Sequence, residues 1–344
     1  MRALALTLMG LGLSSAPALA DPASPAGRWL VTEEVYGTTV YGSLTLTQDG
    51  AALGGEFDGT RLKGSFQGGA LRFTAADEGG SVVVDATLAK GVITGAVVST
   101  DAADPEHPQR YAITATRAVE RPSAPPTRHQ FTPSVFHRQV AAMNRPVLTI
   151  APGDSVHTTT VDAGGGDEKG VTRVLGGNPQ TGPFFVTSAA PGDTLVVHIV
   201  RLRLNRDYAI SDDAIVPRGL SGPMAVRMKD AGKTVRWHID LARGLASLDR
   251  PGPHTAGFSV PVRPMLGCVA VAPPPSRGEP MTNDSGSYGG NMDFNGMVEG
   301  ATLYLPVFVP GALLYLGDAH AVQGDGELTG NALETSVDVE FTVD

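Results

Sequence analysis

The sequence predicts a mainly β protein made of two domains. Short segments that alternate polar and apolar residues recur along the chain, and no long stretch repeats apolar residues with the helical period of 3.6. Glycine (43) and proline (26) are abundant and favour tight turns between short strands. The chain has 344 residues, more than one hydrophobic core usually organises, which favours two domains.

Residues 1–20 have the pattern of a secretory signal peptide. Arg2 supplies a positive charge, residues 3–13 form an apolar run too short to cross a bilayer comfortably, and residues 18–20 read Ala-Leu-Ala, an A-x-A cleavage signal. We therefore expect cleavage after Ala20, a periplasmic or secreted protein, and no membrane insertion after cleavage.

Charge, motifs and cysteine content narrow the function classes. Acidic residues (35) outnumber basic ones (26) and no basic run occurs, so nucleic acid and anionic lipid are poor partners. Neither a G-x-S-x-G nor an H-E-x-x-H motif is present. Cys268, the single cysteine, excludes an internal disulfide. It lies in an apolar run without nearby charge, which favours a buried small residue over a nucleophile.

The first domain is predicted over residues 21–117 as a small antiparallel β-meander or barrel. Its strand candidates are five to eight residues long for the most part and are separated by Gly- and Asp-containing turns such as Asp49-Gly50. Their alternating pattern buries one face and leaves the other in water. The candidates are residues 29–36, 41–48, 52–57, 64–66, 70–75, 81–88 and 92–99.

A Pro-rich linker is predicted at residues 118–134, and a second β-rich domain at 135–344. The linker contains RPSAPPT, which favours an extended chain. In the second domain, residues 147–150 and 194–204 read as buried strands. Two Pro-Gly-Asp turns, at 152–154 and 191–193, are expected to open strands, with Pro and Gly at the two central turn positions.

Polar side chains that could carry chemistry concentrate near the C-terminus. Asp318 and His320 follow the apolar run 312–316, and their i, i+2 spacing puts both on one face of an extended chain. A carboxylate beside an imidazole can bind a metal or act as an acid–base pair. Asp325 and Glu327 repeat this spacing in a glycine-rich stretch. A solvated turn with ordinary surface charges is the alternative interpretation.

Two further carboxylates are candidates. Asp293 lies in Gly-Gly-Asn-Met-Asp, where an Asn/Asp-rich turn is the alternative. Asp162 ends a β-branched strand candidate, beside the loop 163–166. His157 in that strand faces the opposite side if the strand is unbroken, so Asp162 is the preferred ligand of the two.

Five ordered segments resemble the acetamidase/formamidase family. They are NPQTGPFFV (178–186) with APGDTL (190–195), PMLGCVAVAP (264–273), GGNMD (289–293), LYLPV (303–307) with VPGAL (309–313), and GDAHA (317–321) with QGDGE (323–327). Their order and spread over residues 145–344 make the resemblance specific. It implies a β-rich fold, a β-sandwich or barrel with few helices, that hydrolyses short amides such as formamide and acetamide.

The resemblance and the polar motifs together predict metal-assisted amide hydrolysis. Asp162, Asp318 and His320 are the predicted ligands of a divalent metal, with zinc as the candidate. The resemblance also implies a small-molecule amide substrate and a homo-oligomer.

Three carboxylates are predicted to move protons or to support the ligands: Asp293, Glu327 and Glu334. The alternative function is a non-catalytic periplasmic protein that binds small amides on the same scaffold. A hydrolase releases ammonia from amides, whereas a binding protein does not.

Overall fold

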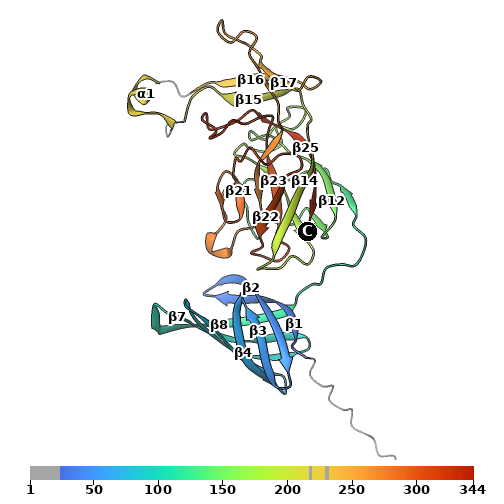
Figure 1. Cartoon of the computed structure of the whole chain (residues 1–344), viewed down its shortest axis with the longest axis vertical. Helices are drawn as coiled ribbons and strands as arrows, with labels where there is room; N and C mark the ends of the chain where they lie inside the picture. The colour runs from blue at the N-terminus through green and yellow to red at the C-terminus, as the bar shows by residue number, and fades with distance from the viewer. Residues whose placement is uncertain (1–23, 217–218, 229–231) are drawn as a thin grey trace, which may run out of the picture.

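The computed structural model describes residues 24–344 except 217–218 and 229–231 (Figure 1). The expected signal peptide, 1–20, lies outside the described residues. Strands dominate, as predicted, and the helical segments with defined bounds are short: α1 (Gly222–Arg227) and η2 (Pro275–Arg277). Within the described residues, no helix has the length and apolar character needed to span a bilayer.

Residues 27–117 form a closed antiparallel barrel of eight strands, which confirms the predicted barrel. Consecutive strands pair by hairpins, and β1 closes the barrel by pairing with β8, with Trp29 opposite Arg117. The strands are β1 (Gly27–Val35), β2 (Thr38–Asp49), β3 (Ala52–Phe57), β4 (Thr60–Gln67), β5 (Ala70–Asp77), β6 (Gly80–Ala89), β7 (Val92–Asp101) and β8 (Asp104–Arg117).

Alternation along the barrel strands separates a dry interior from a wet exterior. In β1, Trp29, Val31 and Glu33 are buried, whereas the neighbouring Glu34 is exposed. Leu71 and Phe73 of β5 follow the same rule and join one apolar cluster inside the barrel. Glu33 therefore stands out as a carboxyl group at an interior position.

The second domain contains a five-stranded sheet in the order β22-β14-β25-β12-β9. Its edge strand β9 pairs in parallel with β12 and lies within the stretch 118–134 that was expected to be a linker. The strands are β22 (Thr302–Pro306), β14 (Thr194–Leu204), β25 (Val337–Val343), β12 (Ser155–Thr159) and β9 (Arg128–Gln130).

A larger sheet faces the five-stranded one and carries the candidate site. Its strands follow the order β18-β17-β16-β15-β24-β23-β19-β21-β20, and β13 pairs with β23, β10 and β11. The bounds are β10 (Phe136–His137), β11 (Leu148–Ile150), β13 (Gln180–Val186), β15 (Tyr208–Asp212), β16 (Thr234–Asp240), β17 (Leu245–Leu248), β18 (Ser259–Pro261), β19 (Met265–Ala270), β20 (Ser285–Gly286), β21 (Gly289–Asn291), β23 (Leu314–His320) and β24 (Glu334–Thr335).

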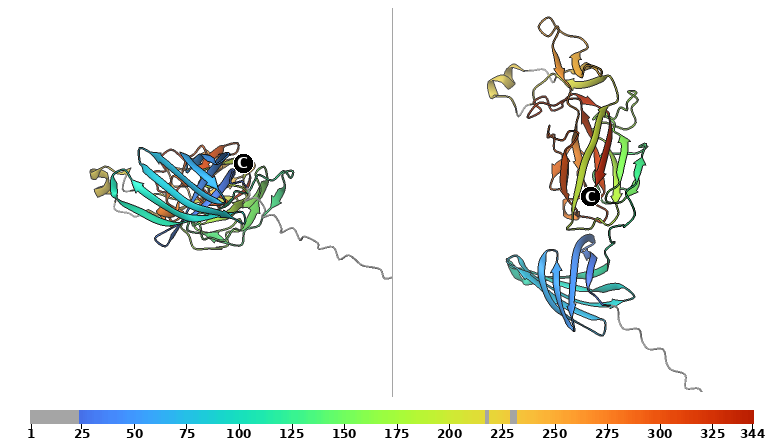
Figure 2. Two further views of the ribbon diagram at one scale, coloured as in Figure 1. Left: turned by 90° about the horizontal axis from the view of Figure 1, so that it is seen from below. Right: turned by 45° about the vertical axis from the view of Figure 1, so that its right-hand side comes forward.

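The two sheets form a β-sandwich around one apolar core. Val197 and Phe341 of the smaller sheet and Phe184, Leu266 and Leu314 of the larger sheet belong to this core. All seven residues of β23 are buried. Strands β15–β18 extend from the sandwich as an arm (the described residues of 208–261), visible at the top of the right-hand view of Figure 2.

The two Pro-Gly-Asp turns open strands, as predicted. Gly153 and Gly192 have φ angles of +94° and +88°, which glycine adopts without steric cost. The carboxylates of Asp154 and Asp193 accept hydrogen bonds from the backbone N–H three residues earlier, and β12 and β14 begin at the next residue. Asp193 also forms an ion pair of 2.7 Å with Arg28 of the barrel, beside a hollow of about 900 Å³ between the domains.

Stability of the barrel is expected to fall as pH rises. Burial, with a smaller effect of Asp58, raises the pKa of Glu33 from 4.5 to about 7. The folded barrel therefore prefers the neutral acid, and stability is lost between pH 4.5 and about 7. The loss should be between about 1 and 3 kcal/mol, because solvent at the open end of the barrel screens part of the effect.

Denaturation followed by Trp29 fluorescence in a Trp237→Phe background measures this slope. Glu33→Gln should remove it, and Glu34→Gln, on the exposed side of the same strand, should keep it. An identical pH profile for wild type and Glu33→Gln would contradict the prediction.

Candidate metal centre

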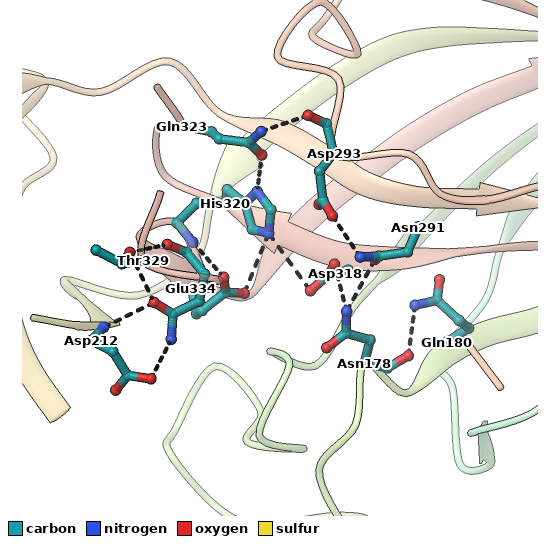
Figure 3. Close-up of polar contacts among 12 residues, drawn as sticks. Asn178, Gln180, Asp212, Asn291, Asp293, Asp318, His320, Gln323, Thr329 and Glu334 are labelled. Atoms are coloured by element: carbon teal, nitrogen blue, oxygen red, sulfur yellow. Dashed lines mark hydrogen bonds and ion pairs between the residues drawn. The ribbon is translucent and has the colours of Figure 1, made fainter. Parts of the chain in front are cut away.

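The end of β23 brings an imidazole and three carboxylates together in the interior. Nε2 of His320 lies 3.6 Å from Oδ1 of Asp318 and 3.3 Å from Oε2 of Glu334 (Figure 3). Asp318 and His320 are 2% and 1% exposed, so these are not solvated turn residues. The strand continues through both residues, beyond the apolar run that the sequence analysis placed before them. Asp293 completes the group on the Asp318 side.

A glycine makes room for the two aspartates. A side chain at Gly267 of β19 would place its Cβ 2.7 Å from Oδ1 of Asp293 and 2.7 Å from Oδ2 of Asp318. The Gly267 carbonyl accepts hydrogen bonds from the N–H groups of Met292 and Asp293. Gly267 therefore both admits the carboxylates and fixes the loop that carries Asp293.

Side-chain amides orient the carboxylates. Nδ2 of Asn178 donates to Oδ2 of Asp318 (2.9 Å) and to Oδ1 of Asn291 (3.0 Å). Nδ2 of Asn291 in turn donates to Oδ2 of Asp293 (2.5 Å). Gln180 donates to the Asn178 carbonyl and so holds the start of this chain of amides. In each aspartate one oxygen is thus occupied and the other is left to face the site.

Gln323 fixes the orientation of His320. Nδ1 of His320 donates to Oε1 of Gln323 (2.9 Å), and Nε2 of Gln323 donates to the Asp293 carbonyl (2.5 Å). This arrangement directs Nε2 of His320 toward the carboxylates. A ring nitrogen held by a hydrogen-bond acceptor, with the other free to coordinate, is typical of histidines that bind metals.

Three carboxylate oxygens in this group are buried without any hydrogen-bond partner: Oδ1 of Asp293, Oδ1 of Asp318 and Oε2 of Glu334. Unpaired buried carboxylate oxygens are costly, because they have lost water without gaining a donor. Donor atoms lie within 4.8 Å of one another in two overlapping sets that share His320, one with Asp293 and Asp318 and one with Glu327 and Glu334. Such a mixed nitrogen and oxygen set fits a divalent metal such as zinc.

Crowding of these acids changes their protonation. Burial and the charge of Asp318 raise the pKa of Asp293 from 3.8 to about 6. Burial and the charge of Glu334 raise the pKa of Asp318 from 3.8 to about 6. Burial and the charge of Asp293 raise the pKa of Glu327 from 4.5 to about 8. Burial opposes the charged imidazole of His320, but the Glu334 and Asp318 carboxylates outweigh it and raise its pKa.

Strained backbone also concentrates here. Asn178, Asp293, Asp318 and Glu327 have φ angles between +42° and +53°, a region that residues other than glycine seldom adopt. They are four of the ten such non-glycine residues in the described part of the chain. Backbone strain persists where the surroundings enforce it and is frequent at functional sites.

Asp162 lies apart from this cluster. Its carboxylate forms a buried ion pair with Arg206 (2.7 Å) and accepts a hydrogen bond from the Gly166 N–H. The expected third ligand thus has a cation as its partner, and the third group beside His320 and Asp318 is Glu334. Both His157 and Asp325 are also outside the cluster: Nδ1 of His157 contacts Gln130, and Asp325 accepts from Asn295.

Cys268 is fully buried, in agreement with a small apolar role. Burial and the charges of Asp318 and Asp293 raise the pKa of its thiol well above the usual value. A nucleophilic cysteine needs the opposite shift.

A largely apolar hollow of about 590 Å³ adjoins the cluster. Gln323 and Glu327 line it on the cluster side, and Trp237, Phe258 and Leu333 line it among the apolar residues. Most of these apolar residues belong to the arm. The larger hollow between the domains contains none of the cluster residues.

The sequence analysis missed the residues that position the ligands. Asn178, Asn291 and Gln323 each lie inside a segment that resembled the family, and Gly267 lies in a fourth. The signal that could have found them is an amide or glycine inside each of these segments. Neither periodicity nor spacing shows that these four residues converge.

Comparison with known proteins connects this geometry to one family. The model of the Acetamidase/Formamidase family matches residues 276–344, which contain all five ionisable members of the cluster. A formamidase from Methylophilus methylotrophus is 23% identical over 238 residues, covering 53% of this chain and 57% of its own length. The chain thus spans little more than half of that relative.

Two solved structures share the fold. The crystal structure of a predicted acetamidase/formamidase from Thermoanaerobacter tengcongensis is 30% identical, with a TM-score of 0.52, over 63% of this chain and 69% of its own. An acetamidase from Yersinia enterocolitica is 28% identical, with a TM-score of 0.53, over 66% and 70% of the two chains.

Loss of the two β23 donors should remove bound metal. We expect the double variant Asp318→Asn, His320→Gln to retain its volume and hydrogen-bonding groups but to bind metal at least about tenfold more weakly, because it loses one anionic oxygen donor and one imidazole donor. Elemental analysis after dialysis against a weak chelator measures this.

Asp325→Asn, an exposed carboxylate in the neighbouring loop, is the control and should keep its metal. The corresponding Ala variants should in addition melt at lower temperature, because they leave cavities in a buried strand. Equal metal content in wild type and the double variant would contradict the assignment.

Proposed function

The chain belongs to the acetamidase/formamidase family, and from that premise we propose that it hydrolyses the C–N bond of small linear amides with the help of a divalent metal. Water adds the hydroxyl to the carbonyl carbon, the C–N bond breaks, and ammonia leaves with a proton from the enzyme. The observation that carries the proposal is the buried, unpaired set of carboxylate oxygens around Nε2 of His320.

His320, Asp318 and Glu334 would hold the metal, with Asp293 beside them. Nε2 of His320 lies 3.6 Å from Asp318 and 3.3 Å from Glu334, and the hydrogen bonds from Asn178 and to Gln323 fix the Asp318 and His320 side chains before any ligand arrives. Zinc is the candidate because the donors combine an imidazole with carboxylates. When bound, such a metal polarises the amide carbonyl and lowers the pKa of water.

Glu327 is suited to move the proton. It lies at the boundary between the cluster and the apolar hollow, and its pKa of about 8 leaves it able to accept and to release a proton near neutral pH. The carboxylate would take a proton from water, and the acid would return it to the nitrogen that leaves. Neutral ammonia is then expelled in place of an amide anion.

The hollow beside Glu327 favours amides with an apolar acyl group. At about 590 Å³ it is much larger than formamide requires, and an aromatic pair forms part of its wall. Trp237 and Phe258 lie 6.3 Å apart between ring centroids, and Trp237 is held by a hydrogen bond from Nε1 to Ser211. We infer that acyl chains longer than that of acetamide fit here.

Glu327→Gln should lower kcat about a hundredfold or more while leaving the metal bound, because the glutamine side chain cannot accept or donate the proton that the carboxyl group transfers. Ammonia release from a panel of linear amides is the measurement, and elemental analysis confirms that metal is present. Glu340→Gln, a carboxylate of β25 that belongs to neither the hollow nor the cluster, is the control and should retain activity.

If Glu327→Gln hydrolyses amides as fast as wild type, Glu327 does not transfer the proton in this mechanism. If small amides raise the melting temperature of the wild-type protein but it releases no ammonia from them, the alternative function, a non-catalytic protein that binds small amides, is supported.

Trp237→Ala should reduce kcat/KM for butyramide about tenfold more than for acetamide, since only the longer chain contacts the removed ring. Leu241→Ala, an exposed apolar residue of the same arm that is outside the hollow, should leave the ratio unchanged. Equal losses for both amides in Trp237→Ala would show that the ring supports the fold of the arm and does not select substrates.

A further inference from the structure

The barrel has a hollow of about 320 Å³ at one end, far along the chain from the metal centre. The β3–β4, β5–β6 and β7–β8 ends of the barrel surround it, together with the last part of β1. We call it the barrel mouth. Its polar and apolar lining residues include Glu33, Asp58, Asp101, Tyr111, Phe57 and Val82.

Glu33 is the unusual member of this lining. Only 7% of it is exposed, and its Oε1 is buried without a hydrogen-bond partner. The alternation of β1 places it in line with Trp29 and Val31, so it projects into the barrel at the bottom of the mouth. A buried carboxylate oxygen without a donor is expensive, and an apolar residue at this interior position would avoid the cost.

The surroundings of Glu33 are acidic and contain no cation. Oδ1 of Asp58 accepts a hydrogen bond from the Ser43 N–H (2.7 Å) and its charge raises the pKa of Glu33. Asp77 and Asp101 lie at the rim, and no Lys, Arg or His is among the residues that line the hollow. The mouth thus offers negative charge that nothing in the described lining neutralises.

We propose that the barrel mouth binds a small organic cation, whose ammonium or amidinium group donates to Glu33 and whose apolar stem packs on Phe57, Ala75 and Val82. The volume lies at the lower end of the range for small-molecule sites. A charge-assisted hydrogen bond to Glu33 would supply the missing donor and stabilise the ionised carboxylate.

A bare divalent metal fits this place less well. A metal requires several ligand atoms close together, and among the described residues the groups of three or more with that spacing all contain His320. The mouth instead combines one buried carboxylate with an apolar wall, which suits a cation that carries a hydrocarbon stem.

The proposal is independent of amide hydrolysis. The family model matches residues 276–344, so the barrel's role does not follow from the family. A failure of one proposal therefore leaves the other standing.

Calorimetric titration of the full chain with n-butylammonium and benzamidinium tests the site, with butan-1-ol as the uncharged analogue and calcium as the metal probe. Wild type should bind the two organic cations and neither of the others. Glu33→Gln should lose at least about tenfold in affinity. Glu34→Gln, the neighbour on the outer face of β1, should bind like wild type.

Glu33→Gln is not expected to unfold the barrel, because it removes a buried charge and keeps the side-chain volume. Its melting temperature, measured on the same sample, verifies this. No binding of either organic cation by wild type, equal binding by Glu33→Gln, or binding of calcium in preference to the organic cations would each overturn the proposal.

Discussion

The buried negative charge around Nε2 of His320 is the constraint on which the second domain depends. Carboxylates from Asp293, Asp318, Glu327 and Glu334 approach one imidazole, and several of their oxygens have no donor among the residues that the structure describes. Without compensation, such a group destabilises the fold, because ionised oxygens in a dry interior cost several kcal/mol each. The rest of the domain holds these groups in place: a fully buried strand, a glycine where no side chain fits, and amides that leave one oxygen of each aspartate unpaired.

Much of the fold could be predicted from the sequence, because local rules determine it. Alternation and Asp-Gly or Pro-Gly turns act over a few residues, so seven of the eight barrel strands and the strand at 194–204 were found, whereas β8 (Asp104–Arg117) had no candidate. The sandwich order could not be predicted in this way. β24 has only two residues, and it joins β15 to β23 although β15 ends at Asp212 and β23 begins only at Leu314.

The site was predictable in composition more than in geometry. Asp293, Asp318, His320 and Glu327 were proposed from motifs and Glu334 without one, and the structure brings all five together. Asp162 is held elsewhere by Arg206, which is distant from it in the chain, so no spacing near Asp162 shows this contact. The burial of Asp318 and His320 could not be predicted from the sequence either, because it depends on the strands that flank β23, which are β13, β19 and β24.

Glu334 occupies a peculiar place in this arrangement. Its backbone pairs with Ile210 of the arm on one side and with His320 on the other, while its carboxylate faces the imidazole. A change in the twist of the arm therefore rotates the peptide that carries a proposed metal donor. If Glu334 holds a metal and the arm contacts the substrate, as proposed, mutations that reshape the arm change metal affinity and substrate choice together. Diversification of such a protein should proceed most freely through single side chains in the hollow, and least freely through insertions or deletions in the arm strands.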